Sequence, residues 1–373
     1  MQTSRTRPDN HHFSPGGRGS TILLMDANTT STRRGRFAPA FTLVVLAPLI
    51  AEYLPGATRT SSIFVFPLEM AIWGGGALLI RAAVRHFKLG WLNMFLMACA
   101  LSIAEEFVIQ QTSLAPMIIQ ITPGPAFGRA FGVNYEYFLW ALFYEAVLVV
   151  MVPVMVTELI FRDRREDPWV GKVGASIVGV LFLIACVPAW FLWTQLVREQ
   201  VFHFPHYTPP AAGVVAGLVA IALLIWLAIG PAREALRGTR EPRQPPSPWL
   251  LGISAVVAAV ISHALVVLAF GFQPYFPVWV AMTAGLIMAA IGLILLPRYA
   301  AHPDWSDSHR MGLALGAVLG SMAIGGVDFS YGAARIDLWG KIISNAVGTV
   351  LILWLATTVR SRRLSAASSP RHA

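Results

Sequence analysis

Residues 211–230 read AAGVVAGLVAIALLIWLAIG, an uninterrupted stretch without one charged, amide or hydroxyl side chain. About 20 apolar residues in an α-helix cross the hydrocarbon core of a bilayer, which is ~30 Å thick. A helix is the expected conformation, because a lipid-exposed backbone has to satisfy its hydrogen bonds within the segment itself. The stretch therefore predicts a transmembrane helix.

Further apolar segments of similar length lie on both sides of this one. The chain of 373 residues is 56% hydrophobic and only 13% charged, whereas soluble domains carry about 25% charged residues. The expected fold class is all-α, a polytopic helical membrane protein with about ten transmembrane helices. The other segments are residues 37–55, 62–80, 91–110, 135–161, 171–194, 248–271, 275–297, 311–328 and 338–358.

The basic residues orient these helices. If the N-terminus is cytoplasmic, the cytoplasmic segments hold all but five of the 28 Lys and Arg residues. Short cytoplasmic loops are enriched in Lys and Arg, so this distribution predicts that both termini are cytoplasmic. Adding or removing one helix would spoil the alternation from that point on. The five basic residues on the outer side are Arg59, Arg129, Arg198, Arg335 and Lys341.

Three regions follow from this pattern. Residues 1–36 are polar and are expected to form a disordered cytoplasmic tail. Residues 37–358 form the ten-helix transmembrane domain, and residues 359–373 form a basic cytoplasmic tail. The first residues lack the apolar run of a cleavable signal peptide. Together with the short loops, this predicts the cytoplasmic membrane of a bacterium as the location.

The net charge of +9 is spread over short clusters between apolar runs. This spacing favours the lipid bilayer as the partner and argues against nucleic acid. No GxxxxGK[ST] or GxGxxG motif is present, so nucleotide use is not expected. The sequence indicates no particular cofactor, metal or oligomeric state.

Two local patterns make predictions about packing. Gly312, Gly316 and Gly320 share one helix face, which allows close approach by another helix, more readily within the chain than between copies. The outer loop 111–134 contains a short apolar stretch, Pro116–Ile121, that a re-entrant or interfacial piece would explain.

Several ionisable residues lie inside the predicted helices. A charge at the bilayer centre costs roughly 2.5–3.5 kcal/mol on insertion scales, so such residues mark candidate functional positions. Counted along the helices, all of them except Glu158 fall in the outer half of the membrane or at its edge. The residues are Glu52, Glu69, Glu105, Glu106, Glu145, Glu158, His263 and Asp328.

The depth coincidence predicts a cluster of carboxylates. Glu106 and Gln110 are four residues apart and are expected to share a polar face. Such a cluster could bind a cation, relay protons or hold a metal together with a histidine. The candidate cation or proton site comprises Glu69, Glu105, Glu106, Gln110 and Glu145, and the candidate catalytic cluster comprises Glu105, Glu106, Glu145 and His263.

The run Ala104-Glu105-Glu106-Phe107 resembles the double-glutamate motif of the CPBP family, the CAAX-protease-like intramembrane proteins. His263 would stand in for the last histidine of that family. The resemblance implies a buried glutamate and histidine site that activates water for peptide hydrolysis. Gln110 and Gln111 stand near the position where the family has an arginine, so the implied relative is diverged or inactive.

Three functions therefore stay open at the level of the sequence. The first, slightly favoured, is proton- or cation-linked transport of a small ion or small molecule. The second is a CPBP-like intramembrane metalloprotease, which would make the protein an enzyme. The third is a non-catalytic membrane scaffold or sensor, in which the glutamates only form hydrogen bonds between helices.

Overall fold

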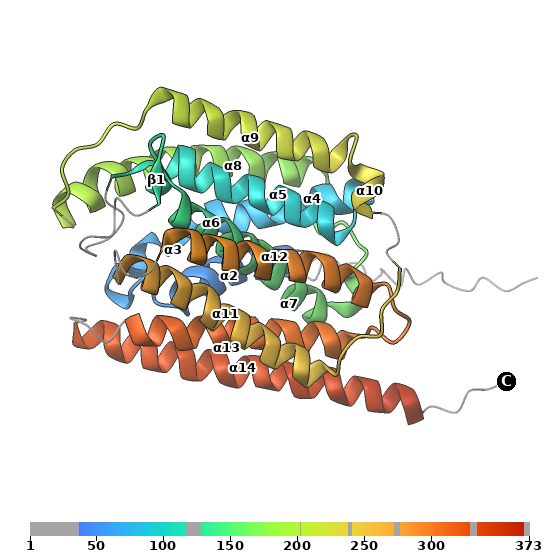
Figure 1. Ribbon diagram of the computed structural model, residues 1–373. Helices are drawn as coiled ribbons and strands as arrows, with labels where there is room; N and C mark the ends of the chain where they lie inside the picture. Colours follow the sequence, from blue (N-terminus) through green and yellow to red (C-terminus); the bar gives the residue numbers. More distant parts are fainter. Residues whose placement is uncertain are drawn as a thin grey trace, which may run out of the picture. The chain divides into compact units, whose positions relative to one another are not determined.

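The structure is a computed structural model that describes residues 37–116, 128–201, 203–237, 241–271, 277–328 and 334–368. Within these residues the long helices lie side by side (Figure 1). The N-terminal tail and the apolar stretch after Pro116 in the loop 111–134 lie outside the described part. One short antiparallel hairpin, β1 (Arg129–Ala130) with β2 (Val133–Asn134), closes that loop.

The helices follow the apolar segments of the sequence, and several of them contain π-helical turns. The first half holds α2 (Ala38–Pro48), α3 (Phe66–Glu69), α4 (Gly75–His86), α5 (Trp91–Ala104), α6 (Tyr135–Glu145), α7 (Val152–Ile160) and α8 (Lys172–Phe191). The second half holds α9 (Ala211–Ile229), α10 (Arg233–Arg237), α11 (Pro248–Gly271), α12 (Val278–Ala300), α13 (Asp307–Asp328) and α14 (Arg335–Ser368). The π-helical turns are Leu49–Tyr53, Met70–Gly74, Glu105–Ile109, Ala146–Met151 and Leu192–Val201, and 3-10 turns cover Thr60–Val65, Thr112–Leu114 and Arg162–Arg164.

Eight helices in the described part are long and apolar enough to cross a membrane. Among the predicted spans, the first corresponds to a shorter apolar helix, Ala38–Tyr53, and α13 is not among the eight. The helix α14 runs on to Ser368, so residues 359–368, predicted as tail, are helical. The all-α membrane fold is confirmed at this level.

The loops that the charge pattern assigns to the cytoplasm meet at one end of the helices. Arg85 contacts Glu166 at 2.6 Å, and the Arg165 guanidinium contacts the Asp307 carboxylate at 2.6 Å. Arg233 donates a hydrogen bond to the Phe87 carbonyl at 2.7 Å. We call this the inner end. The four loops 81–90, 162–172, 231–247 and 298–310 are all joined there, since the Arg243 amide also donates to the Arg298 carbonyl.

Described segments from the other side of the charge pattern meet at the opposite end, which we call the outer end. The Ser61 amide donates to the Asp337 carboxylate at 2.8 Å, and the Trp193 indole N–H donates to the Thr112 hydroxyl at 3.2 Å. The ammonium group of Lys341 donates to the carbonyl of Leu54. The segment before α3 is thereby tied to the first turns of α14.

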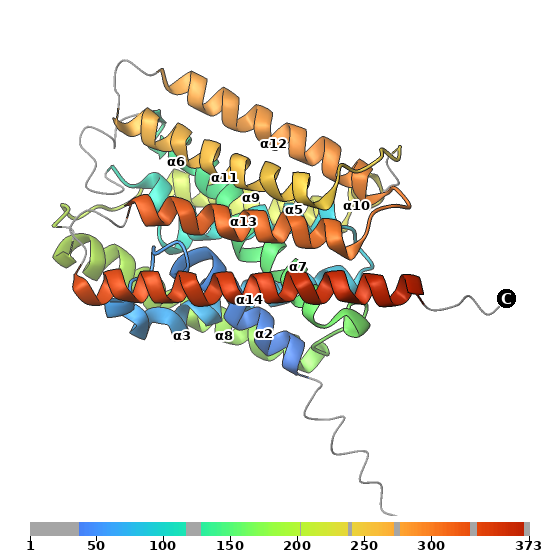
Figure 2. The same cartoon turned by 90° about the horizontal axis from the view of Figure 1, so that it is seen from below.

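The glycine face of α13 packs against α11, as the sequence predicts. A Cβ atom at Gly312 would lie 2.1 Å from the Pro248 carbonyl oxygen, and one at Gly316 would lie 2.1 Å from the Gly252 carbonyl oxygen. The two helices run parallel and in contact, and α14 lies on the other side of α13 (Figure 2). The close approach is therefore within the chain.

Candidate functional site

Glutamates from four separate helical segments converge near the outer end. Glu105 and Glu106 follow α5 and are each 2% exposed, and Glu69 ends α3 and is 5% exposed. Glu145 ends α6, and Glu52 lies in the π-helical turn after α2. The carboxyl of Glu52 interacts electrostatically with those of Glu69, Glu105 and Glu106, and that of Glu145 interacts with the same pair after α5. We call these five residues the glutamate cluster, and the predicted convergence of Glu69, Glu105, Glu106 and Glu145 is observed.

Every member of the glutamate cluster lies in a π-helical turn or one residue before it. Glu52, Glu105 and Glu106 lie inside such turns, whereas Glu69 and Glu145 directly precede the turns that begin at Met70 and Ala146. A π-helical turn has hydrogen bonds from residue i to i+5, and such turns occur frequently at functional sites. The extra residue changes the helix register locally, and with it the direction in which the neighbouring side chains leave the helix.

The hydrogen bonds of the cluster differ from the predicted polar stripe. Gln110 donates from its side-chain amide to the Glu105 carboxylate at 3.0 Å, five residues back, because the turn Glu105–Ile109 has π geometry. Gln110 and Glu106 both line the same cavity. Gln110 therefore lines the cavity together with Glu106, while its hydrogen bond goes to Glu105.

Glu106 and Glu145 form the carboxyl pair at the centre of the cluster. Glu106 accepts hydrogen bonds from the backbone N–H of Ser113 at 2.9 Å and from its hydroxyl at 2.6 Å. Its carboxyl also interacts electrostatically with that of Glu145. Two carboxylates held close together repel each other when both are ionised, and one shared proton or a bound cation would remove that repulsion.

Some buried carboxylate oxygens in this region have no partner in the described part of the protein. Glu69 accepts a hydrogen bond from the Thr58 hydroxyl through Oε1, whereas its Oε2 is buried without one. The same holds for Oε2 of Glu105, of Glu145 and of Glu136, which lies at the start of α6. A buried polar atom without a partner is uncommon in folded proteins and calls for an explanation.

A cavity of about 1890 Å³ opens beside the cluster. Its walls come from α3, α6, α7, α11, α12 and α13, and it extends from Pro55 near the outer end to Trp305 near the inner end. Glu52, Glu69, Glu106 and Glu145 all line it. Glu105 instead faces a small space next to Trp73 and Ser102.

His263 lines the same cavity as the glutamates. This residue lies on α11, with its ring centroid 6.1 Å from that of Trp140 on α6. Among the described residues, no three His, Cys, Asp or Glu side chains are arranged to hold a metal ion together. The catalytic role of the cluster and of His263 stays a prediction, and the side chain of Asp328 lies outside the described part.

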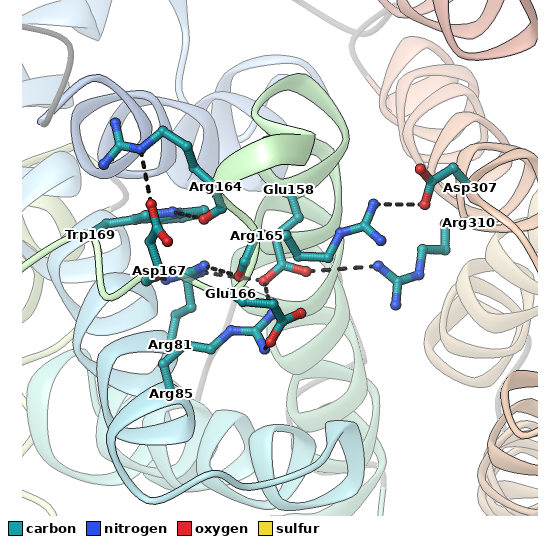
Figure 3. Close-up of polar contacts among 10 residues, drawn as sticks. All are labelled: Arg81, Arg85, Glu158, Arg164, Arg165, Glu166, Asp167, Trp169, Asp307 and Arg310. Atoms are coloured by element: carbon teal, nitrogen blue, oxygen red, sulfur yellow. Dashed lines mark hydrogen bonds and ion pairs between the residues drawn. The ribbon is translucent and has the colours of Figure 1, made fainter. Parts of the chain in front are cut away.

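A second charged cluster lies at the inner end and surrounds Glu158 (Figure 3). The side chain of Glu158 is 1% exposed and contacts Arg85 at 2.7 Å, Arg81 at 3.4 Å and Arg310 at 3.9 Å. Burial lowers the pKa of Arg310, while Glu158 and Asp307 raise it. One carboxylate on α7 therefore holds arginines from α4 and α13.

Arg81 is the most enclosed member of this inner cluster. Its guanidinium lies 3.2 Å from the centroid of the Trp169 ring and donates to the backbone carbonyls of Arg165 at 2.7 Å and Asp167 at 3.1 Å. The sequence predicts Glu158 on the inner side but does not indicate these partners. The one local signal is the i, i+4 spacing of Arg81 and Arg85, which places two guanidinium groups on one face of a helix end.

The geometry leaves two candidate sites, the glutamate cluster with its cavity and the arginine cage around Glu158. The cage pairs one carboxylate with three arginines and has little use for a ligand charge, whereas the glutamate cluster gathers like-charged groups beside a large cavity. Comparison with protein-family models, curated protein sequences and solved structures finds no match to this chain, so the function is inferred from these residues alone.

Proposed function

We propose that this protein is a multi-pass membrane transporter in which the glutamate cluster takes up and releases protons or a cation while a small ion or small molecule crosses the bilayer. The observation that carries this proposal is the carboxyl pair of Glu106 and Glu145, buried among further glutamates and lining a cavity. Burying an isolated ionised carboxylate costs several kcal/mol. A proton or a bound cation removes that cost, so the charge state of the cluster is coupled to what occupies it.

The experiment is a proton-flux measurement in proteoliposomes that contain a pH-sensitive dye. With an inward proton gradient, the native chain is expected to acidify the lumen, and Glu106→Gln to lose most of this flux, because glutamine cannot carry the proton of the pair. Glu241→Gln is the matched control, since this glutamate lies exposed in the loop before α11. Equal flux in all three samples and in empty liposomes would contradict transport and favour a role as a non-catalytic membrane scaffold or sensor.

A CPBP-like intramembrane hydrolase is the second candidate. The observation that favours it is the position of Glu106, Glu145 and His263 on one cavity. It requires two of these groups to share a water molecule at about 3 Å. Transport is preferred because the glutamates come from four helical segments and the cavity extends over most of the helix length.

We further propose ten crossings, both termini in the cytoplasm, and a bacterial cytoplasmic membrane. The distribution of Lys and Arg supports this orientation, and so does the meeting of alternate loops at opposite ends.

Cysteine labelling tests the orientation. In a chain carrying Cys99→Ala and Cys186→Ala, a membrane-impermeant maleimide is expected to label Ala57→Cys in intact cells, because Ala57 is exposed in the loop at the outer end. Glu241→Cys, exposed at the inner end, is expected to react only after permeabilisation. The reverse pattern would invert the proposed topology.

A further inference from the structure

The cavity beside the glutamate cluster is larger and more apolar than a bare ion needs. Its volume is about 1890 Å³, whereas pockets for drug-sized ligands measure about 300–1,000 Å³. Apolar side chains of α11 and α12 make up much of its wall, and aromatic rings line the rest. The aromatic residues facing the glutamates include Trp73, Phe95, Tyr137, Trp140, Phe143 and Tyr144.

The charge of the wall selects for one sign of ligand. Besides the four cluster glutamates that line the cavity, Glu136 contributes a carboxyl group from the start of α6. Among the described lining residues, the arginines are Arg59 in the loop near the outer end and Arg310 near the inner end. Arg310 already contacts Glu158. The part of the cavity lined by these glutamates is therefore acidic, and an anion placed there would be repelled.

Two glutamates on this wall each have one carboxylate oxygen that accepts no hydrogen bond in the described residues. Glu69 is 5% exposed and Glu136 is 4% exposed, and Oε2 of each is buried without a hydrogen-bond partner in the described residues. Leaving such an atom unsatisfied is unfavourable, and more so when the group is charged. A positive charge brought into the cavity by a ligand would remove this cost.

An aromatic cluster on α6 lines the same cavity, and its tyrosines interact with Glu52 and Glu145 of the glutamate cluster. The ring centroid of Trp140 lies 4.9 Å from that of Tyr144 and 5.7 Å from that of Tyr137. Aromatic faces attract cations, and cages of such rings bind quaternary ammonium groups. Small inorganic cations such as Ca²⁺ and Mg²⁺ prefer a shell of oxygen ligands instead.

We propose that this cavity binds an amphipathic organic cation, a molecule with one quaternary or delocalised positive charge on an aromatic or branched apolar body. The charge would lie against the carboxyl groups and the Trp140 ring that line the cavity, and the apolar body along α11 and α12. The inference names the substrate class of the proposed transporter and rests on that proposed function for its biological meaning. Binding itself is measurable without transport.

The test compares two probes of the same size and shape but opposite charge, tetraphenylphosphonium and tetraphenylborate. Binding of each is measured to the purified full-length protein in detergent, and only the part displaced by excess unlabelled probe is counted. We expect saturable binding of tetraphenylphosphonium and none of tetraphenylborate. Glu69→Gln and Trp140→Leu are each expected to weaken binding roughly tenfold or more, while Glu241→Gln leaves it unchanged. Glu136→Gln replaces Glu69→Gln if the latter aggregates on size exclusion.

Equal binding of both probes, or binding of neither, would overturn the inference. Failure here is distinguishable from failure of the proposed function. If tetraphenylphosphonium does not bind but Glu106→Gln still abolishes proton flux, the transporter stands and the substrate class is wrong. If it binds and no proton flux is seen, the site stands and proton coupling is wrong.

Discussion

Replacing Glu158 with glutamine is expected to lower the Tm of the protein more than the loss of any other single carboxylate at the inner end. The glutamate side chain is 1% exposed and contacts Arg81, Arg85 and Arg310. Glutamine keeps the shape but not the charge, so the arginines lose their counter-ion in a buried position. Removing one partner of a buried ion pair costs about 3–5 kcal/mol. The measurement is a thermal unfolding scan of the purified protein in detergent.

Glu166→Gln is the matched control for this experiment. Glu166 also contacts Arg85, at 2.6 Å, but its side chain is 80% exposed. An exposed ion pair contributes only about 0.2–1 kcal/mol, so its loss should leave the Tm almost unchanged. The double variant Glu158→Gln, Arg81→Met should recover part of the lost stability, because one uncompensated charge is gone. Equal shifts for the two glutamine variants would show that the cage around Glu158 does not stabilise the fold.

The second large effect is expected from a single methyl group on the glycine face of α13. In Gly316→Ala, the added carbon would lie 2.1 Å from the Gly252 carbonyl oxygen on α11. Backbone cannot rotate away as a side chain can, so the two helices must move apart. Overpacking of this kind costs about 1–3 kcal/mol, and more where the neighbour is rigid.

Gly292→Ala on α12 is the control with the opposite expected sign. A Cβ atom there meets nothing within 4 Å, and alanine is favoured over glycine in a helix by about 0.8–1.0 kcal/mol. Thermal unfolding of both variants should therefore show a lower Tm for Gly316→Ala and an unchanged or higher one for Gly292→Ala. A lowered Tm in both would mean that loss of glycine itself, and not the contact with α11, is responsible.

The sequence predicts the spans well because long apolar runs admit few alternatives in lipid. Residues 211–230 appear as α9, Ala211–Ile229, and the spacing of Gly312, Gly316 and Gly320 correctly indicates a close helix contact. These features depend on local composition. The partner of the glycine face, α11, could not be named, because many apolar helices would satisfy the same pattern.

Of the glutamate cluster, the sequence indicates only the depth of each residue along its predicted transmembrane helix. Counting residues from the helix ends brings Glu69, Glu105 and Glu145 to a similar level, and the structure places them together. Their hydrogen bonds were not predictable, because a regular 3.6-residue period pairs Gln110 with Glu106, whereas the π-helical turn pairs it with Glu105. Glu158 shows a different limit. Its partner Arg85 is 73 residues away in the sequence, and no local pattern links the two.

The π-helical turns have a consequence for the surface that faces lipid. One residue of an α-helix corresponds to a rotation of about 100°, and a π-helical turn holds an extra residue. The lipid-facing stripe of the span Tyr135–Ile160 therefore changes phase across the turn Ala146–Met151. A single helical wheel drawn through that span therefore misplaces the residues after the turn by about 100° relative to those before it. The two halves have to be indexed separately wherever positions are chosen for labels, cross-links or substitutions.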